Sequence, residues 1–115
     1  MSSPPLTEPT FLILTALAET PQHGYGVIGD VLEISDGRVK LRAGTLYAVL
    51  DRLRTEGLIE VDREEVVQSR LRRYYRLTAL GARRLAEEAA RLRHNANTAG
   101  SRLRRRDLLA EGGVG

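Results

Sequence analysis

The spacing of apolar residues predicts three helices in the first half of the chain. Apolar positions recur every three or four residues over Glu8–Glu19, Gly24–Ser35 and Arg42–Glu56, which is the period of a helix with one buried face. The third segment has the most regular stripe, with apolar side chains at i, i+3, i+4 and i+7: Leu46, Val49, Leu50 and Leu53. Gly57 follows at the position where a glycine ends many helices.

The period changes to two residues after Gly57. The stretches LIEVDREEVV and RLRRYYRL alternate in the manner of half-buried strands, so we expect a hairpin that turns near Gln68–Ser69. Thr78 then suits the N-cap of a long helix, which we expect to reach about Ala99. The segment TPQHG, between the first two helices, is read as a turn.

The predicted order is helix, helix, helix, hairpin and long helix, a mainly α fold with a small β-hairpin (α+β). Two helices followed at once by a hairpin are typical of a winged helix-turn-helix, in which the second helix of the pair enters the major groove of DNA. We therefore assign residues 1–7 to a disordered N-terminus and residues 8–77 to a winged-helix DNA-binding domain. Residues 78–100 form a C-terminal dimerisation helix, and residues 101–115 a basic flexible tail.

Charge is distributed unevenly along the 115 residues. Residues 1–37 contain no Lys or Arg and carry a net charge of −5, whereas residues 38–76 and 77–115 each carry +4. Of the 18 basic residues 17 are Arg, whose planar guanidinium binds phosphate or guanine through paired hydrogen bonds. Basic charge that begins at Arg38, just before the third helix, favours a DNA partner. A merely solvated Arg-rich surface is the alternative.

The residue types present exclude several classes of site. There is no Cys, and hence no disulfide, thiol chemistry or Cys-ligated zinc, which fits a reducing cytoplasm. His23 and His94 lack ligand spacing and are read as surface or turn histidines, so we expect no metal and no cofactor. No phosphate-binding glycine loop or nucleophile–base pair indicates an enzyme. The longest apolar run, FLILTALA, has 8 residues, against roughly 20 for a membrane span. We expect a cytoplasmic protein without membrane contact.

The face of the third helix opposite its apolar stripe is the candidate base-reading surface. It carries small or polar residues: Gly44, Ala48, Arg52 and Thr55. Thr45 flanks this face and offers a hydroxyl to DNA, while Arg42 lies at the positively polarised helix start, which favours phosphate. Arg52 points to DNA on the same face, or else pairs with Glu56 one turn later.

The predicted hairpin supplies candidate phosphate ligands. Arg72 faces outward and is expected to contact phosphate, whereas Arg73 breaks the inner, apolar side and either contacts phosphate or extends into water. Tyr75 and Leu77 are expected in the core. Glu64 and Glu65 would repel phosphate, so we expect the tip not to enter the minor groove deeply.

Two helices carry more apolar surface than one small domain covers. Extra apolar residues widen the face of the first helix, so Phe11 and Leu14 are candidates for a subunit interface. On the long helix, Leu85, Ala89 and Leu92 form a stripe that nothing else in the chain is left to cover. We therefore expect a homodimer.

Three stretches carry a resemblance to a known family: FLILTALAE…HGYGVI, GTLYAVLDRLRTEGLIE and RRYYRLTALGARRL. Over about Phe11–Leu92 the chain resembles the PadR family of transcriptional regulators. The resemblance implies a homodimeric winged-helix repressor bound to a palindromic operator in double-stranded DNA, which a small-molecule effector relieves in some members.

The same resemblance implies roles for particular residues. It places Thr45 and Tyr47 at the start of the recognition helix, where DNA is contacted, although the helical position of Tyr47 equally allows packing. It places Tyr25 at the start of the second helix as a phosphate contact, and Arg72 and Arg73 in the basic part of the wing.

One alternative comes from a different class of function, a winged-helix module that binds another protein and has no specific DNA binding. Such a module would not need basic residues near the recognition helix. The onset of basic charge at Arg38 therefore favours DNA over this alternative.

Overall fold

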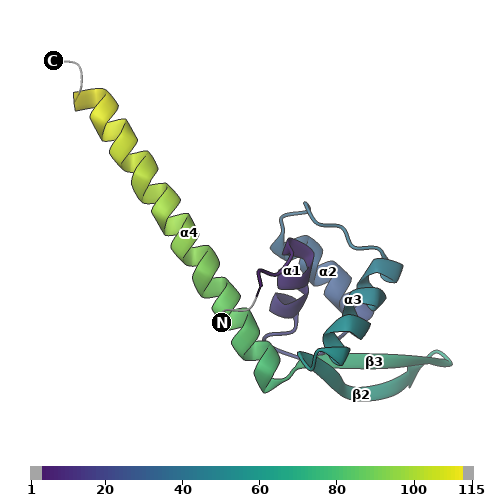
Figure 1. Ribbon diagram of the computed structural model, residues 1–115. Helices are drawn as coiled ribbons and strands as arrows, with labels where there is room; N and C mark the ends of the chain where they lie inside the picture. The colour runs from purple at the N-terminus through teal and green to yellow at the C-terminus, as the bar shows by residue number, and fades with distance from the viewer. Residues whose placement is uncertain (1–3, 113–115) are drawn as a thin grey trace. The chain divides into compact units, whose positions relative to one another are not determined.

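The computed structural model describes residues 4–112 and confirms a mainly α fold with a small antiparallel sheet (Figure 1). The chain divides after Leu85 into two compact units. In chain order the elements are α1 (Glu8–Ala16), β1 (Gln22–His23), α2 (Gly24–Ile34), α3 (Ala43–Thr55), β2 (Ile59–Val67), β3 (Arg70–Leu77) and α4 (Ala79–Gly112). The first three residues, which the sequence assigns to a disordered start, lie outside the described range.

An aliphatic core joins α1, α2, α3 and the sheet within the first unit. The predicted stripe of α3 is confirmed, because Leu46, Leu50 and Leu53 are at most 1% exposed. Tyr75 of β3 is likewise buried, as expected. These side chains pack with residues from the other elements: Ile13, Leu14, Val27, Val31 and Ile59.

Leu14 corrects part of the predicted dimer surface. Its side chain is fully buried in the core of a single chain, so it is not available to a second subunit. The apolar pattern of α1 covers most of the helix, and periodicity alone does not show which side faces the chain's own core. Phe11 is only partly buried at the edge of this core and keeps an exposed portion.

Helix α1 ends at Ala16, three residues before the predicted end. The Gln22 side chain donates to the Ala16 carbonyl at 2.6 Å, and the Leu17 amide is shared between the Ile13 and Leu14 carbonyls. The last turn tightens and stops because a side chain, rather than a further helical amide, satisfies its final carbonyl.

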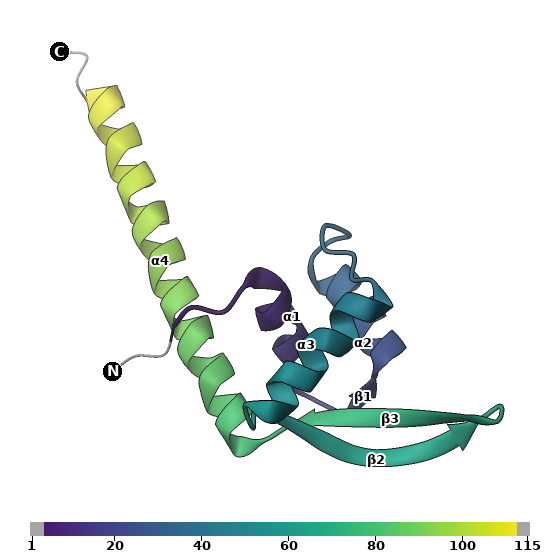
Figure 2. The same ribbon diagram turned by 45° about the vertical axis from the view of Figure 1, so that its right-hand side comes forward.

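The sheet has three strands rather than the predicted two, because a short strand pairs with the hairpin that forms the wing. Gln22 and His23, expected in a turn, form β1 and pair antiparallel with Tyr75 and Tyr74 of β3, so the strand order is β1-β3-β2. A two-residue strand has too little alternation to be recognised in the sequence. Its pairing fixes the start of α2 to the wing, as Figure 2 shows.

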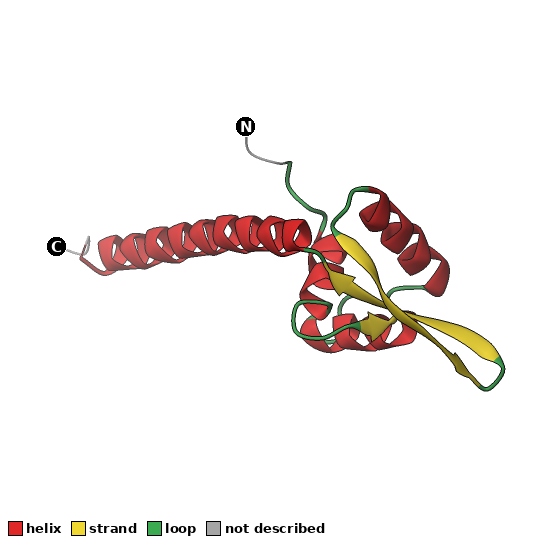
Figure 3. Ribbon diagram, turned by 90° about the horizontal axis from the view of Figure 1, so that it is seen from below, coloured by secondary structure: helices red, strands yellow, loops and turns green. Residues whose placement is uncertain are grey.

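The hairpin turns at Gln68 and Ser69, as predicted. Both residues have positive φ (50° and 65°), the conformation needed by a two-residue turn that matches the strand twist. Beyond the three helices the hairpin extends as a free wing (Figure 3).

Gly57 ends α3 in the predicted way. Its φ is +77°, and the Gly57 and Leu58 amides donate to the Arg54 and Leu53 carbonyls, which is a Schellman motif. Thr78 caps α4 as expected, because its hydroxyl accepts from the Gly81 amide at 3.0 Å.

Helix α4 continues well beyond the predicted end near Ala99. It runs to Gly112, so residues 101–112, expected in a flexible tail, are helical. The reason is compositional: Gly100 is one unfavourable residue, and the stretch after it is rich in the good helix formers Arg, Leu and Ala.

Candidate nucleic-acid interface

A groove of ≈ 820 Å³ lies between the helical pair and the wing. Its walls come from the start of α2, one flank of α3 and the tip half of β3. Four of the seven predicted DNA contacts line it, although they come from three separate parts of the sequence: Tyr25, Tyr47, Arg72 and Arg73. The other three, Arg42, Thr45 and Arg52, lie on α3 or at its start, outside the groove lining.

The two tyrosines have different surroundings in this groove. Tyr25 is 68% exposed on the first turn of α2. Tyr47 is 43% exposed, and its hydroxyl lies against Gly24, where an added Cβ would come within 2.5 Å of that oxygen. Tyr47 therefore packs on the start of α2 and also presents part of its side chain to the solvent. Its helical position allowed either packing or DNA contact, and this placement is compatible with both.

The exposed side of α3 carries small side chains. Thr45, together with Gly44 and Ala48, is exposed at the N-terminal half of the helix. Arg42 is the N-cap residue, and its side chain makes no capping hydrogen bond. The charge of Arg42 adds to the unsatisfied amides at the positive end of the helix, and the two together favour an anion such as phosphate at this place.

Arg52 points along α3 toward α1, away from the groove lining. Its Nη2 donates to Thr10 Oγ1 at 2.9 Å, and its Nε lies 3.4 Å from Glu56 Oε1. The pair with Glu56 is the alternative that the sequence offered. The contact with Thr10 joins positions 42 residues apart and had no signal in the sequence.

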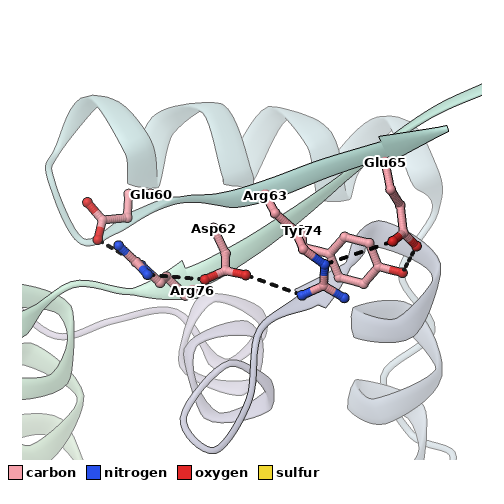
Figure 4. Close-up of polar contacts among 6 residues, drawn as sticks. All are labelled: Glu60, Asp62, Arg63, Glu65, Tyr74 and Arg76. Atoms are coloured by element: carbon pink, nitrogen blue, oxygen red, sulfur yellow. Dashed lines mark hydrogen bonds and ion pairs between the residues drawn. The ribbon is translucent and has the colours of Figure 1, made fainter.

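The base of the wing carries a chain of ion pairs in which its arginines already have acidic partners (Figure 4). Arg76 lies between Glu60 (2.9 Å) and Asp62 (3.1 Å), and Asp62 also accepts from Arg63 at 3.3 Å. The Arg63 guanidinium stacks 3.8 Å above the Tyr74 ring. The hydrogen bond and charge of Glu60 raise the pKa of Arg76 above its usual value.

Toward the tip of the wing the arginines are freer. Arg73 lies 3.3 Å from Glu64, whereas Arg70 and Arg72 have no acidic partner among the residues that the structure describes. Glu65 is occupied by the Tyr74 hydroxyl at 2.6 Å. The net positive potential of the wing is thus concentrated beside the groove. Arg70 was missed as a candidate, although its alternation with Arg72 on the outward side of β3 was the signal that could have found it.

His23 has a structural role that its lone position in the sequence did not indicate. It is the N-cap of α2, where Nδ1 accepts from the Gly26 amide at 3.3 Å, and its ring meets Tyr74 edge-on at 5.3 Å. Partial burial lowers the pKa of His23, the charge of Arg72 lowers it further, and Glu65 opposes the shift. The neutral form is the one that can cap the helix.

The lowered pKa of His23 predicts that the stability of the protein depends on pH. Because the folded-state pKa of His23 is below the unfolded value of about 6.5, the unfolded chain binds more protons between the two values. The contribution to stability is complete above about pH 6.5 and is lost as the pH falls. Denaturant unfolding between about pH 7.5 and 5.5 should show this decline in the wild type and in His94→Asn. It should be reduced in His23→Asn, which keeps a capping oxygen; an unchanged decline in that variant would contradict the assignment.

The described residues hold no group of three or more His, Asp or Glu side chains arranged to bind a metal ion. Among residues 4–112, no helix contains an apolar stretch of the length and low charge that a bilayer span requires.

Comparison with known proteins supplies a family. Residues 13–87 match the model of the transcriptional regulator PadR-like family. The chain is 37% identical over 76 residues to the transcriptional regulator Rv3488 of Mycobacterium tuberculosis, which covers 66% of this chain and 67% of that protein.

Solved structures show the same fold. A PadR family transcriptional regulator from Eggerthella lenta superposes with a TM-score of 0.65 at 31% identity, over 82% of this chain and 80% of that one. Bacillus subtilis PadR in complex with operator DNA has a TM-score of 0.61 at 23% identity, over 68% of this chain and 45% of that chain, a likeness of fold alone. The family match covers more than half of the sequence, and the chain belongs to the PadR-like family of transcriptional regulators.

Proposed function

We propose that the protein is a homodimeric repressor that binds a palindromic operator in double-stranded DNA. The observation that carries the proposal is the meeting of Tyr25, Tyr47 and the wing arginines in one groove beside the exposed side of α3. Basic and aromatic groups from three elements converge there, and within residues 4–112 neither Arg70 nor Arg72 has an acidic partner. The B. subtilis relative of the same fold was solved on operator DNA.

The proposal divides the work between helix and wing. Thr45 and the small residues near it allow α3 to approach base edges in the major groove closely, while Arg42, Arg72 and Arg73 neutralise phosphates on either side. Tyr25 is exposed on the first turn of α2, and its hydroxyl donates a hydrogen bond to a phosphate of the DNA backbone. Base contacts give sequence preference, and phosphate contacts give affinity that depends on salt.

Dimerisation is supported by the pattern of α4. Apolar residues follow one another at alternating steps of four and three along this 34-residue helix: Leu85, Ala89, Leu92, Ala96, Ala99 and Leu103. Alternation of this kind is the heptad seam of a coiled coil, and Leu92 and Leu103 are 41% and 53% exposed in the single chain. A two-fold dimer would place two copies of α3 on half-sites about 34–36 Å apart, or a multiple of that.

This division predicts different effects for two substitutions. Thr45→Ala should weaken binding to the operator by about 1 kcal/mol or more and leave binding to random DNA nearly unchanged. Arg72→Ala should weaken binding to both alike and reduce the salt slope by about one. Thr55→Ala is the matched control, since this α3 hydroxyl is already bonded to the Asp51 carbonyl at 3.0 Å. Equal effects of the two substitutions on both duplexes would contradict the division.

The proposed function is tested by selecting binding sites from a random-sequence pool of duplex DNA with the wild-type protein. We expect one inverted repeat to be enriched and to bind two protein chains per duplex. Enrichment of no sequence would overturn the proposal and would favour a winged helix that binds another protein.

A further inference from the structure

Two polar contacts hold the first turn of α1 to the helix-turn-helix. Arg38, in the loop between α2 and α3, donates to both carboxylate oxygens of Glu8 at 2.7 and 3.0 Å. Arg52 of α3 donates to Thr10 Oγ1 at 2.9 Å. Both contacts are made by residues 8–10 of this turn, so α1 is fixed to the loop between α2 and α3 and to the later part of α3.

The acceptor of the second contact is well defined. Thr10 is 3% exposed, and its amide and hydroxyl are both engaged with the hydroxyl of the N-cap residue Thr7. The position of Thr10 Oγ1 is therefore set by the helix cap rather than by solvent. The hydrogen bond to this oxygen therefore fixes the Arg52 guanidinium relative to α1.

Arg52 and the predicted base-reading residue lie on the same side of α3. Thr45 precedes Arg52 by seven residues, almost two helical turns, and side chains at that spacing lie on one side of a helix. On the other flank of α3, Tyr47 rests against Gly24 of α2. In addition to the buried leucine stripe, one contact on each flank restrains the rotation of α3 about its axis: Tyr47 against α2 and Arg52 against α1.

We propose that Arg52 is a positioning residue, which holds α3 against the Thr10 hydroxyl of α1 and so sets the direction in which Thr45 meets DNA, rather than a phosphate ligand. The inference rests on the proposed function, because it concerns how this helix is presented to an operator. The second partner of Arg52, Glu56, supports it: its carboxylate offsets the guanidinium charge that a phosphate would otherwise meet, while Nη2 is bonded to the Thr10 hydroxyl.

Thr10→Val separates the two roles, because it removes the acceptor while Arg52 keeps its charge. For a positioning residue, Thr10→Val and Arg52→Gln should each lower affinity for the pool-enriched duplex about tenfold, the loss expected from one hydrogen bond to a charged group. The double variant should be no weaker than either single one. Affinity for a scrambled duplex and the salt slope should stay unchanged. Arg54→Gln is the matched control, since it removes the same charge from the same helix without a contact to α1.

The alternative role gives opposite results. A phosphate ligand would make Thr10→Val neutral or slightly favourable, while Arg52→Gln would lower the salt slope by about one and weaken both duplexes, and that outcome would overturn the inference alone. A wild-type protein that binds the enriched and scrambled duplexes equally would overturn the proposed function, and this inference with it. Thermal unfolding of each variant shows that it is folded, and amide hydrogen exchange in α3 should be faster in Thr10→Val than in the control.

Discussion

If the protein forms the proposed dimer, Leu92→Glu is expected to convert it into a monomer and to reduce affinity for a duplex with two half-sites by about 100-fold or more. Leu92 lies in the middle of the heptad seam of α4 and is 41% exposed in the single chain, so its replacement leaves the chain's own core intact. In a dimer, Leu92→Glu would place one carboxylate from each chain in an apolar contact, where neither has a charged or hydrogen-bonding partner. The loss of affinity follows because each chain would bind its half-site alone, without the effective concentration that linkage provides.

Ala90→Glu is the control for this substitution. It introduces the same charge into the same helix at an exposed position two residues away, outside the seam. Ultracentrifugation should give the mass of one chain for Leu92→Glu and of two chains for Ala90→Glu, and affinity for a duplex with a single half-site should be similar in both. If Leu92→Glu remained a dimer, the assignment of the seam would be wrong.

Gly81→Ala is expected to lower the free energy of unfolding by about 3 kcal/mol, at the upper end of the usual cost of overpacking. Gly81 lies in the first turn of α4, and a Cβ added there would stand 1.9 Å from the Leu58 carbonyl oxygen and 2.9 Å from its carbon. The obstacle is backbone and cannot rotate away. The same carbonyl accepts from the Thr78 amide at 3.1 Å, so any displacement also strains the junction between the wing and α4.

Gly29→Ala is the matched control, because it makes the same change inside a helix where no heavy atom apart from the neighbouring helix backbone lies within 4 Å of the added Cβ. It should stabilise the protein by up to about 1 kcal/mol, the difference in helix propensity between Gly and Ala. Denaturant unfolding of both variants measures the two effects. A Gly81→Ala protein as stable as Gly29→Ala would show that the close approach of α4 to Leu58 is not required.

The sequence predicted the elements whose cause is local. The stripe of α3, the end of that helix at Gly57, the cap at Thr78 and the turn at Gln68–Ser69 all follow from residues within a few positions of each other. The early end of α1 and the strand β1 did not, because Gln22 acts on α1 across the intervening turn, through Ala16, and on β1 through Tyr75, which is distant in sequence. The continuation of α4 beyond Gly100 was underestimated because a single glycine was read as a boundary.

The candidate site shows the same division. Periodicity predicted Thr45 on the exposed side of α3 and Arg72 on the wing, and the structure has both residues at these places. It could not separate the two apolar sides of α1, so Leu14 was placed at an interface although it is fully buried. Nor could it detect the contact of Arg52 with Thr10, because only the fold brings these two residues together. The capping role of His23 is local, since the Gly26 amide lies three residues on, but histidine is not among the residues usually found at an N-cap.

The affinity of the wild type for the pool-enriched duplex and for a scrambled duplex, measured between about 50 and 200 mM salt, decides whether the protein reads DNA sequence. We expect a ratio of at least about 10³ in favour of the enriched duplex, with a steep fall of both affinities as salt increases. Equal affinity for the two duplexes would contradict it, because the exposed side of α3 would then read no bases.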